Sequence, residues 1–392
     1  MIVNDCTRDY IRHHRDDDVR KLALKGCQDP DVDFPFALQQ IQGRQKAKEK
    51  LPEMFANPDI LFPATVSMEQ CSSEATARYK ASILHGNIFA DLSGGFGVDA
   101  LALAKVFKQG FYVEPMAELC ELMKHNTNVL NINNLHILNG TLEELLPTLP
   151  DVDVIYLDPS RRNVHGQRVV TLQECSPDLT RCKELLLKKA RCQVVVKLSP
   201  MLDLKSTLTL LPETHAIYVI AVHGECKEIL LQLSHDTSET IDYHAVNIQN
   251  GNISDFQFDS KEEAEAVPAL ADSLGEYLLE PNAAVLKAGA FKSIATRYGL
   301  KKLHPHTHLY TCYTPPENFP GRCFRILNHF HYSKKEAAQN LSGIKKANIA
   351  VRNFPWSAEE LRKQLKLADG GDVYLFGATM RKGELVVIVG EK

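Results

Sequence analysis

The sequence carries the glycine-rich run Asp91-Leu92-Ser93-Gly94-Gly95-Phe96-Gly97-Val98-Asp99-Ala100 between a β-prone segment at 88–90 and a helical pattern. Glycines at such a strand-to-helix turn let the backbone approach a ligand closely, and the first N–H groups of the helix can bind it. The run therefore predicts a ligand-binding loop at the carboxyl end of the first strand of an α/β sheet.

Short β-rich runs alternate with helical stretches on the carboxyl side of this loop. This alternation predicts parallel βαβ units and a doubly wound sheet of seven strands. The last two runs are joined without a helix, which predicts an antiparallel hairpin at one edge of the sheet. Residues 1–85, in contrast, have a helical pattern. The seven runs lie at 88–90, 110–113, 136–138, 154–157, 193–196, 216–220 and 229–233.

Two classes of ligand fit the glycine loop. Residues 95–100 match the dinucleotide fingerprint GxGxxG/A, and Glu114 lies 19 positions after Gly95, near the spacing of a ribose-binding acid. A lone match of this kind is weak. Asp91 at the start of the turn would repel a pyrophosphate, whereas it suits a ligand with an amino group and a sulfonium. S-adenosylmethionine therefore fits the loop better than NAD does.

The chain resembles the class I S-adenosylmethionine-dependent methyltransferases at three strand ends. The run from Asp91 to Gly97 is similar to the first motif of that family, Glu114 to the second, and Asp158-Pro159 to the fourth. Ser93 departs from the family, whose loop usually begins with glycine. The resemblance implies that Glu114 binds the ribose hydroxyls. It also implies that the methionine part of the cofactor is cradled by Asp91, Ser93, Gly94, Gly95 and Gly97.

Two further residues are candidate cofactor contacts. Thr141 follows the third strand, where the family often has an acid near the adenine, but with Glu144 it also fits a helix capping box. Gln70 belongs to the segment 68–81, which resembles the helix that covers the cofactor in many nucleic-acid methyltransferases. A capping box that begins at Ser73 is the alternative interpretation of that segment.

The fourth predicted strand ends in Asp158-Pro159-Ser160-Arg161-Arg162. Enzymes that methylate exocyclic base nitrogens often have Asp/Asn-Pro-Pro-aromatic here, so that a polar side chain and a carbonyl accept the amino hydrogens. This chain lacks the aromatic residue and has two arginines, which can stack on a base or bind a phosphate. We expect catalytic roles for Asp158, Pro159 and Arg161, and substrate contacts from Arg162 and Lys197.

The segment after the fifth predicted strand disfavours uracil-C5 methylation of RNA. Uracil-C5 methyltransferases need a cysteine nucleophile there, and this chain has Lys197-Leu198-Ser199-Pro200.

The net charge of −4 hides a division of the chain. Residues 281–392 carry 18 basic and 8 acidic side chains, whereas residues 1–280 carry 27 and 41. A basic end of this kind either binds a polyanion such as nucleic acid or docks on an acidic domain. From residue 325 onward, strands and helices alternate in the pattern of a small α+β domain.

The whole chain resembles a bacterial group, found especially in Bacteroidetes, of methyltransferases with a C-terminal THUMP-like domain. The residues that carry this resemblance lie at 280–289, 347–354 and 369–376. It implies that the basic C-terminal region docks RNA, either tRNA or rRNA. We predict a helical region at 1–85, a Rossmann-like methyltransferase domain at 86–240, an acidic linker at 241–280, a small ferredoxin-like segment at 281–322 and a THUMP-like domain at 323–392.

Composition favours a cytoplasmic protein in a reducing compartment. Ten cysteines form no CxxC pair, no apolar run reaches the ~20 residues of a membrane span, and the first residues lack a signal-peptide pattern. His304, His306 and His308 have the alternate spacing of metal ligands on a strand, but Pro305 and the lack of a nearby acid in the sequence argue against a metal. The oligomeric state does not follow from the sequence.

The sequence thus predicts an S-adenosylmethionine-dependent methyltransferase that acts on a base of tRNA or rRNA. The alternatives are a methyltransferase for a small molecule or a protein, and a cofactor-binding module without catalysis.

Overall fold

The computed structural model describes residues 3–160, 172, 175–235 and 238–392. The chain divides into two compact units. The first comprises Met1–His215 and Ile229–Thr237, and the second comprises Ala216–Glu228 and Ser238–Lys392. Within the described residues, no helix is both long and apolar enough to cross a membrane.

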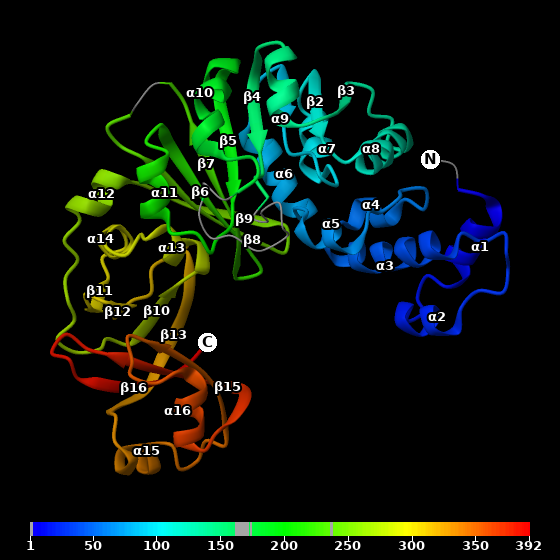
Figure 1. Ribbon diagram of the computed structural model, residues 1–392. Helices are drawn as coiled ribbons and strands as arrows, with labels where there is room; N and C mark the ends of the chain where they lie inside the picture. The colour runs from blue at the N-terminus through cyan, green and yellow to red at the C-terminus, as the bar shows by residue number, and fades with distance from the viewer. Residues whose placement is uncertain (1–2, 161–171, 173–174, 236–237) are drawn as a thin grey trace. The chain divides into compact units, whose positions relative to one another are not determined.

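Residues before the first strand form helices, as predicted (Figure 1). The longest of them, α3, begins at the N-cap Asp33 and contacts α1, α2, α4 and α5. Its buried face includes Gly43, where a side chain would overlap Phe62. The helices are α1 (Asp5–His13), α2 (Val19–Lys25), α3 (Phe34–Lys50), α4 (Pro52–Ala56), α5 (Thr65–Gln70) and α6 (Glu74–Ile83).

All seven predicted runs form strands of one sheet, but this sheet has nine strands. They are β1 (Ile88–Asp91), β2 (Gln109–Glu114), β3 (Leu135–Asn139), β4 (Val152–Leu157), β5 (Ala190–Leu198), β6 (Thr214–Val222), β7 (Glu225–Leu233), β8 (Asp242–Gln249) and β9 (Asn252–Asp259). Their order is β3-β2-β1-β4-β5-β7-β6-β8-β9. The pairs from β3 to β5 are parallel, so the carboxyl ends of β1, β2, β4 and β5 meet at one edge.

The two additional strands correct the prediction in two places. The hairpin β6–β7 does not end the sheet, because β8 pairs with β6 in parallel and β9 pairs with β8. Residues 241–280, interpreted from composition as an acidic linker, instead form β8, β9, a helix and the start of a further strand. The Asn250-Gly251 turn, at φ of 51° and 80°, has the type I′ pattern of a two-residue hairpin.

The connections between strands are mostly short helices. One of them, α8 (Ala117–Val129), buries Leu119 and Met123 toward the sheet. The remaining helices of this region are α7 (Val98–Ala104), α9 (Leu142–Leu145), the 3-10 helix η1 (Leu146–Thr148), α10 (Leu179–Lys189), α11 (Leu204–Leu210) and α12 (Ser260–Glu265).

A second, seven-stranded sheet lies in the second unit, and its elements follow the predicted α+β pattern (Figure 1). Its order is β11-β12-β10-β13-β16-β15-β14, and only β14 and β15 are parallel neighbours. The elements are β10 (Tyr277–Pro281), α13 (Ala283–Ala288), α14 (Ser293–Arg297), β11 (Lys301–His304), β12 (Thr307–Cys312), β13 (Gly321–His331), α15 (Lys334–Asn340), β14 (Lys346–Arg352), α16 (Ala358–Leu365), β15 (Ala368–Thr379) and β16 (Leu385–Glu391).

This second sheet curls until its two ends meet. The Thr307 hydroxyl at the start of β12 donates to the Thr379 carbonyl at the end of β15, at 2.8 Å. The side chain of Asn353, directly after β14, donates to Thr307 Oγ1 at 3.3 Å. Buried side chains such as Leu278, Phe324 and Ile388 fill the interior.

The close packing of β1 against β2 generates a stability prediction. A Cβ at Gly110 would overlap the ring of the fully buried Phe89. Because overpacking forces buried groups off their rotamers, we expect Gly110→Ala to lower the free energy of unfolding by about 1–3 kcal/mol in urea denaturation. Gly343→Ala is the control, since a Cβ there meets no atom within 4 Å. Equal midpoints for the two variants would contradict the packing argument.

Candidate functional site

The glycine loop connects β1 to α7 and is fixed to β2. Gly94 N–H donates to the Val113 carbonyl at 2.9 Å, and the Tyr112 hydroxyl donates to the Gly95 carbonyl at 2.6 Å. Gly97 is the N-cap of α7 in the left-handed region, at φ 81°. The loop is therefore held by hydrogen bonds to the neighbouring strand before any ligand is present.

The three glycines of the loop serve different purposes. A Cβ at Gly94 would overlap the Tyr112 ring, and one at Gly97 would lie 2.6 Å from Met123 Cε. Both positions thus need glycine for packing inside the protein. Among the described residues, a Cβ at Gly95 would meet only the Ser93 carbonyl oxygen, at 3.8 Å. The backbone at Gly95 is therefore the part of the loop that a ligand can approach.

Ser93 joins the ends of β1 and β4. Its hydroxyl donates to Asp91 Oδ1 at 3.3 Å and accepts from Asp158 N–H at 2.6 Å, while its own N–H donates to Asp91 Oδ1 at 3.0 Å. The serine in place of the family's usual glycine thus brings two predicted site residues, Asp91 and Asp158, to one point.

Glu114 at the end of β2 is buried and faces the same loop. Its two carboxylate oxygens accept from Gly95 N–H at 2.8 Å and from Met116 N–H at 2.9 Å. Two backbone donors therefore set the orientation of the carboxylate, whose remaining lone pairs can accept hydrogen bonds from hydroxyl groups.

Thr141 and Gln70 lie in different surroundings. Thr141 forms the predicted capping box of α9, with reciprocal bonds to Glu144. Gln70 is exposed at the last position of α5. The helix that follows, α6, is capped by Ser73, which was the alternative interpretation of this segment.

Asp158 and Lys197 form an ion pair across the ends of β4 and β5. Lys197 Nζ lies 2.5 Å from Asp158 Oδ2, and the two side chains are 11% and 34% exposed. Pro159, next to Asp158, is buried. The predicted residues Arg161 and Arg162 lie outside the described part of the chain.

A buried network connects this ion pair to α6 and α7. Ser72 Oγ accepts from Lys197 Nζ at 3.1 Å and from Lys80 Nζ at 2.8 Å, and it donates to Asp99 Oδ2 at 2.7 Å. Lys80 Nζ also lies 2.8 Å from Asp99 Oδ1 and 3.3 Å from the Tyr156 hydroxyl. Sequence reasoning missed Ser72, Lys80, Asp99 and Tyr156. Lys80 at 1% exposure is a lysine on a buried helix face, and a helical-wheel plot of α6 could have revealed it.

The carboxylates of this edge have pKa values shifted in opposite directions. The pKa of Asp91 is raised to about 7, mainly by burial and also by the nearby carboxylates of Asp99 and Asp158, while the hydrogen bonds from Ser93 act against the shift. The pKa of Asp99 is lowered, because the charges of Lys80 and Lys197 outweigh the effect of burial. Burial raises the pKa of Asp158, although Lys197 acts against the shift. Such divergence among neighbouring acids is typical of functional sites.

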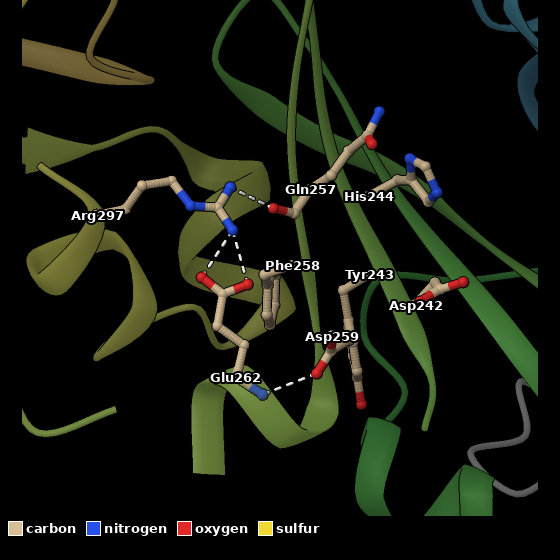
Figure 2. A pocket seen from close by; sticks show the side chains of 8 residues that line it. All are labelled: Asp242, Tyr243, His244, Gln257, Phe258, Asp259, Glu262 and Arg297. Carbon is tan, nitrogen blue, oxygen red and sulfur yellow. Dashed lines mark hydrogen bonds and ion pairs between the residues drawn. The ribbon is translucent and has the colours of Figure 1, made fainter. Parts of the chain in front are cut away.

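A separate cavity lies in the second unit and contains none of the predicted site residues. Figure 2 shows its lining, where Arg297 donates to both carboxylate oxygens of Glu262 at 2.6 and 2.7 Å and to the Gln257 carbonyl at 2.5 Å. Within the described ranges, no three His, Cys, Asp or Glu side chains are grouped as metal ligands, and His304, His306 and His308 are not so grouped.

Comparison with known proteins identifies both parts of the chain. Residues 277–320 match a family model described as a ferredoxin-like domain, and residues 321–392 match one described as THUMP domain-like. A crystal structure from Porphyromonas gingivalis W83, described as that of a methyltransferase, is 33% identical, covers 100% of both chains and has a TM-score of 0.90.

Two sequence relatives extend this picture. An uncharacterized S-adenosylmethionine-dependent methyltransferase of Mycobacterium tuberculosis is 25% identical over 343 residues, which are 85% of this chain and 89% of the relative. An uncharacterized RNA methyltransferase of Enterococcus faecalis is 34% identical over 102 residues, which are 25% of this chain and 22% of that protein.

The buried network generates a stability prediction. Lys80→Met leaves the carboxylate of Asp99 buried without its cation, so we expect a loss of about 3–5 kcal/mol in the free energy of unfolding. Urea unfolding followed by circular dichroism measures the loss. The control is Lys183→Met, whose partner Glu213 lies 2.6 Å away in a pair that is 23% and 21% exposed, and for which about 1 kcal/mol is expected. Equal losses would show that burial of the Lys80 pair has no special importance.

Proposed function

The chain belongs to the S-adenosylmethionine-dependent methyltransferases that carry a C-terminal THUMP-like domain, and we propose that it transfers the methyl group to a base of tRNA or rRNA. The observation that carries this proposal is the Ser93 hydroxyl, which joins the cofactor acid Asp91 to the acceptor acid Asp158. The methyl donor and the acceptor must meet within van der Waals distance for transfer, and this link places their binding groups side by side.

The residues of the β1–β2 edge fit S-adenosylmethionine. The open backbone at Gly95 leaves room for the methionine part, and the buried carboxylate of Asp91 suits its ammonium and sulfonium charges. Glu114 is oriented by two backbone N–H donors and accepts hydrogen bonds from the ribose hydroxyls. Gly94 and Gly97 contribute by shaping the loop, while Thr141 would lie near the adenine and Gln70 would belong to the segment that covers the cofactor. When bound, the cofactor supplies a methyl group activated by its sulfonium.

Asp158 and Pro159 act on the acceptor. The Asp158 carboxylate and the Pro159 carbonyl accept the hydrogens of an exocyclic amino group and so direct the nitrogen lone pair at the methyl carbon. Lys197, at 2.5 Å, favours the ionised form of Asp158 and so opposes the rise in its pKa that burial causes. Transfer would form the N–CH3 bond as the S–CH3 bond breaks, and the methylated amino group would then lose its proton to solvent water. Arg161 and Arg162 follow Asp158-Pro159 in the chain and would contact the base or its phosphate.

Three observations support an RNA substrate. The region 281–392 carries an excess of ten positive charges, its last 72 residues match the THUMP-like model, and a relative at partial coverage is named an RNA methyltransferase. The basic region would supply the affinity for phosphates, which is sequence-independent and sensitive to salt.

The pKa of Asp91 generates a prediction on cofactor binding. Its carboxyl is protonated below about pH 7, whereas the cationic cofactor favours the ionised form, so binding must release this proton. The association constant for S-adenosylmethionine should therefore fall as pH drops below 7, by up to about tenfold per pH unit. Calorimetry between about pH 5 and 6.5 measures this, since the cofactor's own α-amino group, with a pKa of about 7.7–8.0, stays protonated there.

The matched variants for this experiment are Asp91→Asn and Asp33→Asn. Asp91→Asn should weaken binding and remove the pH dependence. Asp33 is the N-cap of α3, a position that Asn fills equally well, so its variant should retain the wild-type profile. A wild-type profile that is flat across this range would refute the role given to Asp91.

The proposed reaction is tested with labelled cofactor and RNA from a strain that lacks the gene. We expect the full chain to transfer the methyl group to the tRNA or rRNA fraction. Asp158→Ala should lower the rate by about 100-fold or more while the affinity for the cofactor changes little. Transfer to protein or to small molecules only would overturn the RNA assignment, and tight cofactor binding without transfer to any fraction would favour a module without catalysis.

A further inference from the structure

A buried carboxylate in the second unit holds two arginines. Glu280, near the end of β10, is 2% exposed. Arg322, its cross-strand partner on β13, donates from Nε and Nη2 to Glu280 Oε2 at 3.1 and 2.5 Å. Arg352, at the end of β14, donates from Nη2 to Glu280 Oε1 at 2.7 Å. Each carboxylate oxygen thus fixes one guanidinium, and the trio has a net charge of +1.

Both guanidiniums remain open to solvent. The side chains of Arg322 and Arg352 are 48% and 35% exposed, whereas that of Glu280 is 3% exposed. Arg352 also donates from Nη1 to the Val351 carbonyl at 2.8 Å. A guanidinium has five N–H groups, and these bonds use two in each arginine. Glu280 fixes the orientation of both guanidiniums, so a ligand that bound their remaining N–H groups would cost little further side-chain entropy.

Other basic and polar groups surround the pair where the sheet curls on itself. Asn353, directly after Arg352, has a left-handed backbone at φ 51° and donates to His304 Nδ1 at 3.3 Å. His306 N–H lies 3.1 Å from the same nitrogen. The pKa of His308 is lowered to about 4, first by burial and then by the charges of Lys302, His306 and Arg352. The local field is therefore positive.

We propose that Arg322 and Arg352, pre-oriented by Glu280, bind backbone phosphates of the RNA substrate. This inference rests on the proposed function and assigns its RNA contact to named residues. Guanidiniums bind phosphates through paired N–H groups, and such contacts are strongest when the fork is already fixed. One arginine would be enough to neutralise the charge of Glu280, whereas the structure pairs it with two partly exposed arginines. The chemistry is that of a phosphate group, which could belong to RNA or to a free anion.

The experiment measures binding of fluorescently labelled bulk tRNA to the full chain by anisotropy at several salt concentrations. Arg322→Gln and Arg352→Gln should each weaken binding by about tenfold and lower the steepness of the salt dependence by about 0.7–0.9 per lost phosphate. Arg322→Lys keeps the charge but loses the fork, so an intermediate loss is expected. The control is Arg381→Gln, which removes an arginine that is 49% exposed and paired with Asp272 at 2.8 Å; it should bind within about twofold of wild type.

The possible outcomes distinguish a failure of the phosphate site from a failure of the proposed RNA function. If wild-type protein binds tRNA and the Arg322 and Arg352 variants match the Arg381 control, the phosphate site is refuted and the RNA function stands. If wild-type protein binds neither tRNA nor rRNA at low salt, the RNA function itself fails. Inorganic phosphate that binds by calorimetry and is lost in the variants, without any change for tRNA, would reassign the site to a free anion. If a glutamine variant unfolds at a lower temperature than the wild-type protein, the tRNA binding of Arg322→Lys tests the phosphate site instead.

Discussion

The candidate site of the first unit depends on how three neighbouring carboxylates, two of them buried, are paired. Asp99 is paired with Lys80, and its pKa is lowered. Asp158 is paired with Lys197, which partly offsets its burial. Asp91 instead accepts from the neutral Ser93, and its pKa is raised to about 7. Among the described residues, the structure thus pairs Asp99 and Asp158 with lysines, whereas Asp91 accepts hydrogen bonds from Ser93.

Ser72 explains how the two lysines can be buried together. A hydroxyl offers one donor and two acceptor positions, and Ser72 uses all three, toward Asp99, Lys80 and Lys197. The segment before β1 is therefore structural at this point: it orients Lys197, and through Lys197 it orients Asp158. A network of this kind is rigid when complete and costly when one member is removed. The acceptor acid is thereby held in place by residues far from it in the sequence.

The sequence predicted the elements with a local signal and missed those that depend on tertiary contacts. The alternation of strands and helices located seven of the nine strands of the first sheet. Thr141 with Glu144 indicated a capping box that the structure contains. The strands β8 and β9 were missed although Asn250-Gly251 is a strong hairpin signal, because the acidic residues that follow dominated the composition. Ser72 and Tyr156 were missed because their contacts are tertiary, and Lys80 was missed although its place on the buried face of α6 is a local signal. The glycines were predicted because a ligand must approach the backbone. Two of them, Gly94 and Gly97, are also needed for packing, since a side chain there would overlap Tyr112 or Met123.

The two proposed binding sites share one physical property, which is an imbalance among charges whose positions are fixed. At the sheet edge, Lys80 and Lys197 pair with Asp99 and Asp158, so that an ionised Asp91 is left without a lysine partner among the described residues. S-adenosylmethionine carries one net positive charge, with its ammonium and sulfonium against a carboxylate, and would neutralise the charge of Asp91. At Glu280 the imbalance is reversed, with two guanidiniums on one carboxylate, and a phosphate would neutralise it. Because unpaired charge is unfavourable where solvent is limited, a fold that retains such an imbalance is stabilised by a ligand of opposite sign. The overall charge of −4 therefore says little about the partners of this chain. The two proposed sites rest instead on the charges that surround Asp91 and Glu280.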